Sequence, residues 1–135
     1  MVDRQSRNNY CLQVNHFYIA RHGETENNRA KRLSGWIDTP LTASGLEPLE
    51  TVLAKLQNIA IDRIYSSDLG RAFITAYAMA RRLPIDTEII RLPGLREVNY
   101  GDAASMPSAE AYERYPGLDS NTHFTPPNGE SLATM

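Results

Sequence analysis

The chain has 135 residues, which is enough for one globular domain with a buried core but not for two. Hydrophobic residues make up 41% of it and charged residues 22%, a composition that excludes a disordered or fibrous protein. With 14 Lys and Arg against 16 Asp and Glu, the net charge of −2 gives no general attraction for nucleic acid or anionic membranes. Any anion site must therefore be local.

The N-terminal residues bear on location. Residues 1–14 are polar and aperiodic, so we expect a flexible tail ahead of one domain that spans residues 15–135. They lack the apolar segment of a signal peptide, and no run in the chain approaches the roughly 18 apolar residues of a membrane span. The expected location is the cytoplasm, with no nucleic-acid or membrane partner.

Cysteine and histidine content argues against a metal site. The lone Cys11 excludes an internal disulfide and is most simply a small, half-buried thiol. The three histidines are too scattered to give tetrahedral zinc spacing: His16, His22 and His123. No metal or cofactor is therefore expected.

The first predicted element is a buried strand over residues 16–20, where the sequence is aromatic and β-branched and ends before Gly23. Residues 24–41 show no sustained period, which predicts a long functional loop with at most one short helical turn. A helix then begins near a capping-box match at Ser44-Gly45-Leu46-Glu47 and is expected to pack on the sheet. Its apolar residues recur at helical spacing: Leu46, Leu49, Leu53 and Leu56.

A second strand is predicted over residues 61–65. The next helix has an apolar face that runs from Leu69 to Leu83, with Arg71 in its first turn. An oxygen of the preceding Ser66-Ser67-Asp68 is expected to cap this helix.

The C-terminal part adds a third strand and a short helix. The strand is predicted over residues 88–92, and residues 95–100 are expected to form an irregular segment. A helix is expected over 107–115 and a loop over 117–129, which is rich in Pro, Asn, Ser and Thr. The alternation of strands and helices predicts an α/β fold with a mostly parallel sheet flanked by helices.

Candidate site residues follow two of the predicted strands. Ligands of parallel α/β sheets bind beyond the carboxyl ends of the strands, so Arg21, His22 and Arg71 are expected at one crevice. Two planar guanidinium groups suit a phosphate, and the start of a helix adds to the positive potential at Arg71. A histidine with an ordinary pKa near 6.5 leaves one ring nitrogen free to act as a nucleophile at neutral pH.

Five short motifs stand in order between residues 16 and 131. They are Arg21-His22-Gly23-Glu24-Thr25 with Asn28, Gly35-Trp36-Ile37-Asp38-Thr39-Pro40-Leu41-Thr42, Ser66-Ser67-Asp68-Leu69-Gly70-Arg71-Ala72, Leu95-Arg96-Glu97-Val98-Asn99-Tyr100-Gly101 and Pro127-Asn128-Gly129-Glu130-Ser131. Together they resemble the histidine phosphatase superfamily. The resemblance implies the three-layer phosphoglycerate mutase-like fold, of which this chain would hold the N-terminal two-thirds.

The resemblance also implies a covalent mechanism. His22 would attack the phosphorus of a small phosphorylated metabolite, and water would then hydrolyse the phosphohistidine. Arg21 and Arg71 would bind the phosphoryl oxygens, and Asn28 would add a neutral hydrogen bond. Glu97 would protonate the leaving oxygen and later help to deprotonate water, which needs a carboxyl that is protonated part of the time near neutral pH. No metal is required, since the arginines supply the positive charge.

Several candidates have simpler structural explanations. Ser34 and Gly35 either line the substrate end of the pocket or only form a turn. For Arg71 the alternative is a solvated ion pair with Asp68, and for Glu97 it is an exposed ion pair with Arg96. For Asn28 the alternative is an ordinary turn.

The residue after the candidate acid bears on the branch of the superfamily. Mutases of the family place an arginine there, which helps to hold a substrate with a second anionic group, whereas this chain has Val98 after Glu97. A neutral side chain favours water as the phosphoryl acceptor. We therefore favour a phosphatase, similar to α-ribazole phosphatases and fructose-2,6-bisphosphatases, over a mutase.

The family's second catalytic histidine lies beyond the Gly129-Glu130-Ser131 turn, and this chain ends at Met135. Neither His16 nor His123 has the right context to replace it. We therefore expect a C-terminally truncated form of the fold with an exposed apolar sheet edge. A phosphate-binding or regulatory module without turnover is the alternative function.

Overall fold

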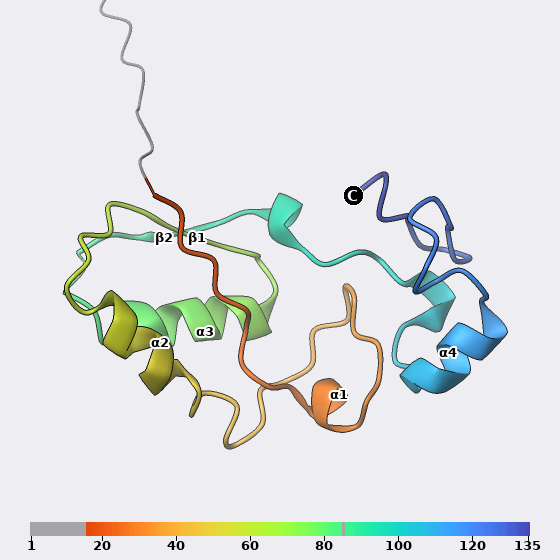
Figure 1. Ribbon diagram of the computed structural model, residues 1–135, viewed down its shortest axis with the longest axis horizontal. Coiled ribbons are helices and arrows are strands. Elements are labelled where there is room, and N and C mark those ends of the chain that lie inside the picture. Colours follow the sequence, from red (N-terminus) through yellow and green to blue (C-terminus); the bar gives the residue numbers. More distant parts are fainter. Residues whose placement is uncertain (1–15, 85) are drawn as a thin grey trace, which may run out of the picture.

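The computed structural model describes residues 16–84 and 86–135, so the predicted tail over residues 1–14 lies outside the described part. One end of it holds a parallel pair of strands, β1 (Ile64–Ser66) and β2 (Ile89–Arg91), in which Ile64 lies opposite Ile89. Helix α3 (Gly70–Ala80) connects the two strands and packs against both (Figure 1). This unit confirms the predicted α/β fold and the parallel pairing.

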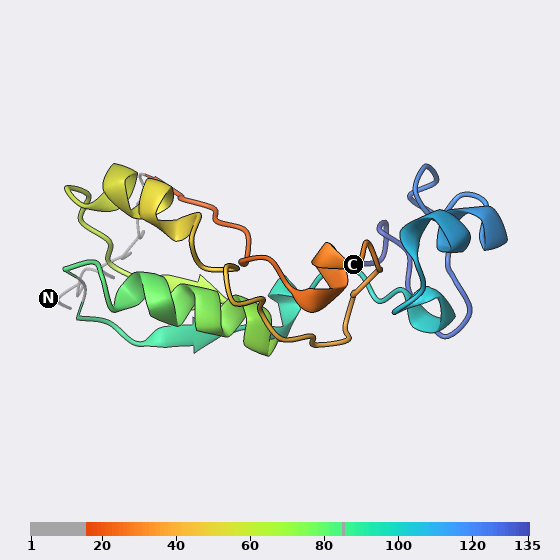
Figure 2. The same ribbon diagram turned by 90° about the horizontal axis from the view of Figure 1, so that it is seen from below.

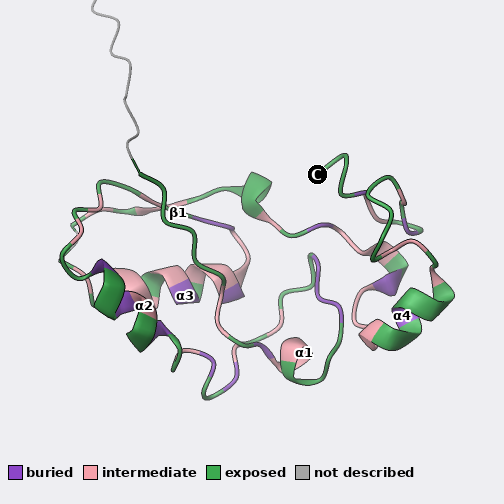
Figure 3. Ribbon diagram, in the orientation of Figure 1, coloured by how far each residue is buried: buried purple, intermediate pink, exposed green. Residues whose placement is uncertain are grey.

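The predicted strand over residues 16–20 is wrong. Residues 16–24 have no regular secondary structure, and Phe17 and Ile19 are 80% and 97% exposed (Figure 3). A strand is stable only when its backbone N–H and C=O groups pair with a neighbour, and no other described segment pairs with these residues. The aromatic and β-branched pattern therefore favours a strand, but without a paired neighbour the apolar side chains of this segment lie at the surface.

Helix α2 (Leu49–Leu56) begins later than predicted. Leu49, Leu53 and Leu56 are buried, as their spacing predicts, but the residues before them form turns. The N-cap is Pro48, which gives no side-chain hydrogen bond, so the capping box predicted at residues 44–47 is wrong. A proline disfavours helical backbone at the residue before it, which explains the later start. Figure 2 shows α2 beside α3.

The long loop over residues 24–41 contains one short helix, as predicted. Helix α1 (Glu26–Arg29) begins with a capping box in which Thr25 and Asn28 each bond the other's backbone N–H. The loop then turns toward helix α4 (Ser108–Arg114) at the opposite end of the molecule from β1 and β2 (Figure 1). Two 3-10 turns connect the sheet to this end: Pro93–Leu95 and Gly101–Ala103.

A small apolar cluster joins the loop to α4. Leu33, Ala103 and Ala111 are buried together, and four larger side chains pack against them: Tyr100, Met106, Tyr115 and Leu118. The helix predicted over 107–115 is confirmed, and residues 117–129 form turns as expected.

Gly101 provides a test of this C-terminal packing. Its φ is +50°, and an added Cβ would lie 2.1 Å from the carbonyl oxygen of Pro127. We expect Gly101→Ala to lower the free energy of unfolding, measured by urea denaturation, by about 2 kcal/mol or more. Gly94→Ala is the matched control, because nothing lies within 4 Å of its Cβ, and it should change stability by less than about 0.5 kcal/mol. Equal effects of the two changes would contradict this account.

Candidate active site

His22 has one ring nitrogen bound to backbone and the other directed at an arginine. Nδ1 lies 2.7 Å from the carbonyl oxygen of Gly23, which can only accept, so Nδ1 carries the proton. Nε2 then presents its lone pair, and Nε of Arg71 lies 3.3 Å from it. The ring nitrogen available for nucleophilic chemistry is therefore Nε2.

The surroundings of His22 favour its neutral form. Partial burial lowers its pKa from the ordinary value of 6.5, and the hydrogen bond to the Gly23 carbonyl opposes that effect. The positive charges of Arg71 and Arg21 lower the pKa further, whereas the carboxylate of Glu97 raises it. The net effect keeps the imidazole neutral, and therefore nucleophilic, at neutral pH.

The backbone beside His22 is bound closely to α3. The N–H of Gly23 donates to Oγ1 of the buried Thr75 at 3.0 Å, and that hydroxyl donates to the carbonyl of Arg71 at 2.7 Å. A Cβ on Gly23 would lie 2.2 Å from the carbonyl oxygen of Gly45. The backbone at Gly23 therefore lies too close to that of Gly45 for a larger residue, although residues 16–20 form no strand.

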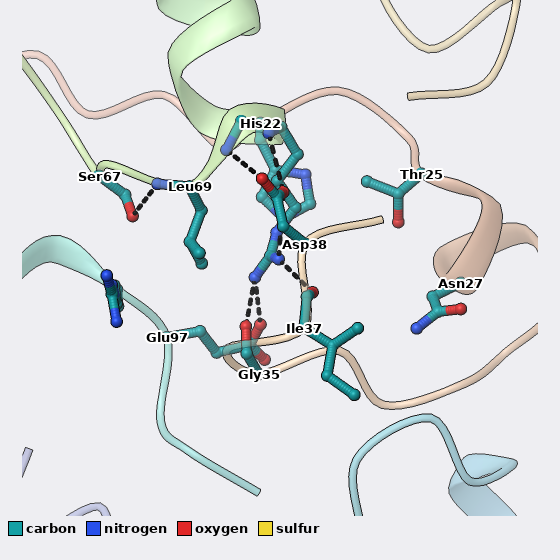
Figure 4. Close-up of polar contacts among 12 residues, drawn as sticks. His22, Thr25, Asn27, Gly35, Ile37, Asp38, Ser67, Leu69 and Glu97 are labelled. Atoms are coloured by element: carbon teal, nitrogen blue, oxygen red, sulfur yellow. Dashed lines mark hydrogen bonds and ion pairs between the residues drawn. The ribbon is translucent and has the colours of Figure 1, made fainter. Parts of the chain in front are cut away.

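Arg71 is 3% exposed, and the two edges of its planar guanidinium have different partners (Figure 4). Nη1 donates to the carbonyl of Ile37 at 2.8 Å and Nη2 to that of Gly35 at 2.7 Å. The other edge carries Nε, which contacts His22, and the second N–H of Nη2, which lies 3.2 Å from Oε2 of Glu97. One edge is thus bound to the loop, and the other faces the two candidate catalytic groups.

Asp38 holds the start of α3, a role that the sequence analysis missed. Its carboxylate accepts the backbone N–H groups of Gly70 and Arg71, the latter at 3.1 Å. The cap predicted from residues 66–68 is wrong, because the hydroxyl of Ser67 accepts only the N–H of Leu69, which precedes the helix. The only sequence signal for Asp38 was its place in the second motif.

Glu97 is half-exposed and is held at its backbone by Trp36, whose Nε1 donates to the Glu97 carbonyl at 2.9 Å. Arg96 lies over the Trp36 ring at 4.9 Å, and the Nε and Nη2 edge of its guanidinium donates to both carboxylate oxygens of Asp68. The alternative explanations of Arg71 and Glu97, as surface pairs with Asp68 and Arg96, therefore do not hold. The carboxylate of Glu97 faces Arg71 instead.

A pocket of about 620 Å³ opens beside these groups. Its walls include five of the seven predicted site residues and exclude Arg71 and Gly35. The lining residues are Arg21, His22, Glu24, Asn28, Lys31, Arg32, Leu33, Ser34, Glu97, Tyr100, Ser108 and Tyr112. Gly35 has a φ of +53°, and its turn directs a carbonyl at Arg71, so the structure places it as a turn residue behind the site.

Two polar residues in the wall have groups that a ligand could use. Asn28 accepts the N–H of Thr25 through Oδ1, so its turn role is real, and its Nδ2 has no partner within residues 16–84 and 86–135. Ser34 is 6% exposed, and its buried hydroxyl has no hydrogen-bond partner in the described chain. Buried hydroxyls are normally bonded, which makes Ser34 a candidate donor to a bound molecule.

Tyr100 also lines the pocket and was missed as a site residue, although it stands in the motif that contains Glu97. Burial raises the pKa of Tyr100 to about 12, and the negative charge of Glu97 adds to the effect. Its hydroxyl therefore stays protonated and able to donate across the whole neutral range.

No group of three or more His, Cys, Asp and Glu side chains able to hold a metal ion occurs in the described part of the chain. Among the described helices, none is long and apolar enough to cross a membrane.

The fold and the pocket define an α/β protein with a half-buried histidine beside the side chains of Arg21 and Arg71. The profile of the histidine phosphatase superfamily (branch 1) matches residues 17–135, and the chain belongs to this family. The family predicted from the five motifs is thus confirmed.

Three similar proteins illustrate the range of the family. "Probable phosphoglycerate mutase GpmB" of Proteus mirabilis is 36% identical over 129 residues, which are 92% of this chain and 58% of that protein. "Fructose-2,6-bisphosphatase TIGAR" of Xenopus laevis is 39% identical over 118 residues, 84% of this chain and 43% of that protein. The crystal structure of the α-ribazole phosphatase from Shigella flexneri superposes with a TM-score of 0.70 at 30% identity, covering 84% of this chain and 57% of that one. The chain therefore spans about half the length of the proteins it matches.

The environment of His22 predicts its titration. We expect NMR titration of its imidazole to give a midpoint below 6.5, because burial and two arginines oppose protonation. The unfolded chain then binds this proton more readily than the folded chain does, so the contribution of His22 to stability falls as the pH drops through 6.5. In Arg21→Gln the midpoint should move upward. A midpoint above 6.5 in the unaltered chain would contradict the geometry.

The two-edged binding of Arg71 predicts that lysine cannot replace it. An ammonium cannot reach both loop carbonyls while it also faces His22 and Glu97, so a buried carbonyl loses its partner. We expect Arg71→Lys to lower the free energy of unfolding by about 2 kcal/mol and to weaken the binding of inorganic phosphate measured by calorimetry. Arg82→Lys, at an exposed pair with Glu50, is the control and should be nearly neutral in both measurements.

Proposed function

We propose that this chain carries the phosphoryl-transfer site of a phosphomonoesterase that acts through a phosphohistidine on His22. The observation that carries the proposal is that Nε2 of His22 and Oε2 of Glu97 both contact one edge of the buried Arg71. A nucleophile, a carboxyl group and a fixed cation thus lie together beside the pocket, whose lining includes His22 and Glu97. A phosphoryl group placed there would take the two N–H groups of that edge.

The reaction has two steps. Nε2 of His22 attacks phosphorus in line, the ester P–O bond breaks, and Glu97 donates a proton to the leaving oxygen. Water then attacks the phosphohistidine and gives its proton to Glu97, the P–N bond breaks, and inorganic phosphate leaves. The two steps together return the site to its starting protonation state, so no further reactant is required.

Three other residues of the pocket wall bind the phosphoryl oxygens. Arg21 supplies a positive charge opposite the negative charge of the phosphoryl group, and the hydroxyl of Ser34 and Nδ2 of Asn28 supply neutral hydrogen-bond donors. These donors gain strength as charge redistributes in the transition state. The substrate is a small phosphorylated metabolite. The proposed compartment is the cytoplasm, which suits a chain whose lone Cys11 cannot form an internal disulfide.

Mutase activity is the second candidate, favoured by the similarity to GpmB. Val98 argues for hydrolysis. It is 5% exposed and does not line the pocket, so this position offers no charge to hold a phosphorylated acid for rephosphorylation.

The test is phosphate release from p-nitrophenyl phosphate in the presence of a metal chelator. We expect His22→Ala to lower the rate by about 1,000-fold or more, because the nucleophile is lost. His123→Ala is the control, since this exposed histidine lies outside the pocket. Full activity in His22→Ala would refute the proposal. Ester binding without turnover would support the binding module instead, and isomerisation of a phosphoglycerate would support the mutase.

A further inference from the structure

Glu97, the acid of the proposed reaction, follows a stretch of chain that apolar packing does not hold. Residues 91–95 are exposed, and the side chains of Leu92 and Leu95 are 38% and 50% exposed. Nothing lies within 4 Å of a Cβ placed on Gly94. A general acid has to lie within hydrogen-bond reach of the oxygen it protonates, and a displacement of about 1 Å can lower a rate about 100-fold. The position of Glu97 therefore depends on polar contacts.

Arg96 binds this stretch to the start of α3. Its Nε and Nη2 donate to the two carboxylate oxygens of Asp68 at 2.8 and 2.5 Å, a paired geometry that fixes the orientation of both groups. The hydrogen bonds from Arg96 lower the pKa of Asp68, so the pair stays charged throughout the neutral range. Asp68 lies just before Gly70, the first residue of the helix that carries Arg71. The pair thus holds the segment with the acid against the helix with its cationic partner.

Trp36 joins these contacts to the long loop. The guanidinium of Arg96 lies 4.9 Å from the centre of the Trp36 ring, and Nε1 of Trp36 donates to the backbone carbonyl of Glu97 at 2.9 Å. The two neighbours of Trp36 in the sequence supply the loop carbonyls that bind Arg71. One stacked pair of side chains therefore connects the loop, the acid and the start of α3.

Arg96 and Glu97 face opposite sides of the backbone. Arg96 is extended, with a φ of −66° and a ψ of 153°, and successive side chains of extended backbone alternate in direction. Arg96 accordingly contacts Asp68 and Trp36. The carboxylate of Glu97 instead contacts Nη2 of Arg71 at 3.2 Å and lines the pocket, whose lining does not include Arg96. Any effect of Arg96 on the reaction therefore passes through Glu97.

We propose that Arg96 is a positioning residue for the general acid. Bound to Asp68 and stacked on Trp36, it holds Glu97 where the carboxyl group can protonate the leaving oxygen. This inference rests on the proposed function, which assigns that proton transfer to Glu97. The loss caused by removing Arg96 should therefore grow with the need of the leaving group for a proton.

The test compares two substrates that differ only in a nitro group, phenyl phosphate and p-nitrophenyl phosphate. Nitrophenolate is the more stable anion and leaves with little help from an acid, whereas phenolate depends more on the proton. The value of kcat/KM reports the transfer to His22, and its ratio for two substrates is independent of the fraction of protein that is folded. We expect Arg96→Gln to lower kcat/KM about tenfold for phenyl phosphate and less than about threefold for p-nitrophenyl phosphate.

Three further variants define the route of the effect. Arg96→Lys keeps the charge but cannot form the paired hydrogen bonds, so we expect it to reproduce most of the loss. Arg114→Gln is the matched control and should leave the ratio unchanged. Arg114 also lies beside an aromatic ring, 5.7 Å from the centre of Tyr115, but outside the pocket lining. In a Glu97→Gln background, Arg96→Gln should not change the ratio further, because the acid is already lost.

The outcomes separate the two proposals. Equal losses for both substrates, or no loss, overturn the role of Arg96, and the proposed function stands if turnover still depends on His22. A change of the ratio that persists undiminished in the Glu97→Gln background also overturns that role, because Arg96 then acts by another route. If the unaltered chain turns over neither substrate, both proposals are overturned.

Discussion

The structure of the site depends on the need of a buried guanidinium for hydrogen-bond acceptors, which four of the five N–H groups of Arg71 find. An unpaired buried charge costs several kcal/mol, so the segments around Arg71 must supply acceptors in the directions of its N–H groups. Loop residues 35 and 37 supply two backbone carbonyl oxygens as acceptors. His22 supplies a ring nitrogen and Glu97 a carboxylate oxygen. Residues from three distant parts of the sequence therefore converge on one side chain. The same contacts that satisfy the charge place a nucleophile beside an acid.

Asp38 changes the electrostatics expected at the start of α3. The first N–H groups of a helix form an anion site, and the sequence placed Arg71 in that positive potential. In the structure the carboxylate of Asp38 occupies those N–H groups, so they are not available to a ligand. An anion bound at this pocket would then have to be held by side chains, and the lining offers guanidinium groups, a hydroxyl and an amide.

The elements that the sequence predicted correctly are those set by local pattern. The helix α3, the strand β2 and the short helix α4 all follow from spacing within a few residues, although the buried residues of α3 are Arg71 and Thr75 and not its apolar ones. Residues 16–20 carry an equally clear strand pattern and form none, because pairing depends on a neighbour that local pattern does not report. The cap of α3 was missed for the same reason, since Asp38 is separated from Gly70 by 32 residues. Likewise, the place of Arg71 after the second predicted strand pointed to a phosphate ligand. Its hydrogen bonds to the loop and to His22 join residues that are far apart in the sequence, which local spacing does not report.

The contacts of His22 fit both of the charge states that the proposed reaction requires. Before attack, burial and the two arginines keep the ring neutral, which preserves the lone pair on Nε2. Once the P–N bond forms, the ring becomes cationic, and the hydrogen bond from Nδ1 to the Gly23 carbonyl then stabilises that charge. The incoming phosphate also offsets the positive charges of Arg21 and Arg71, so the factors that oppose a cationic ring weaken when the substrate arrives. A single backbone carbonyl thus fixes the tautomer needed for attack and supports the intermediate that follows.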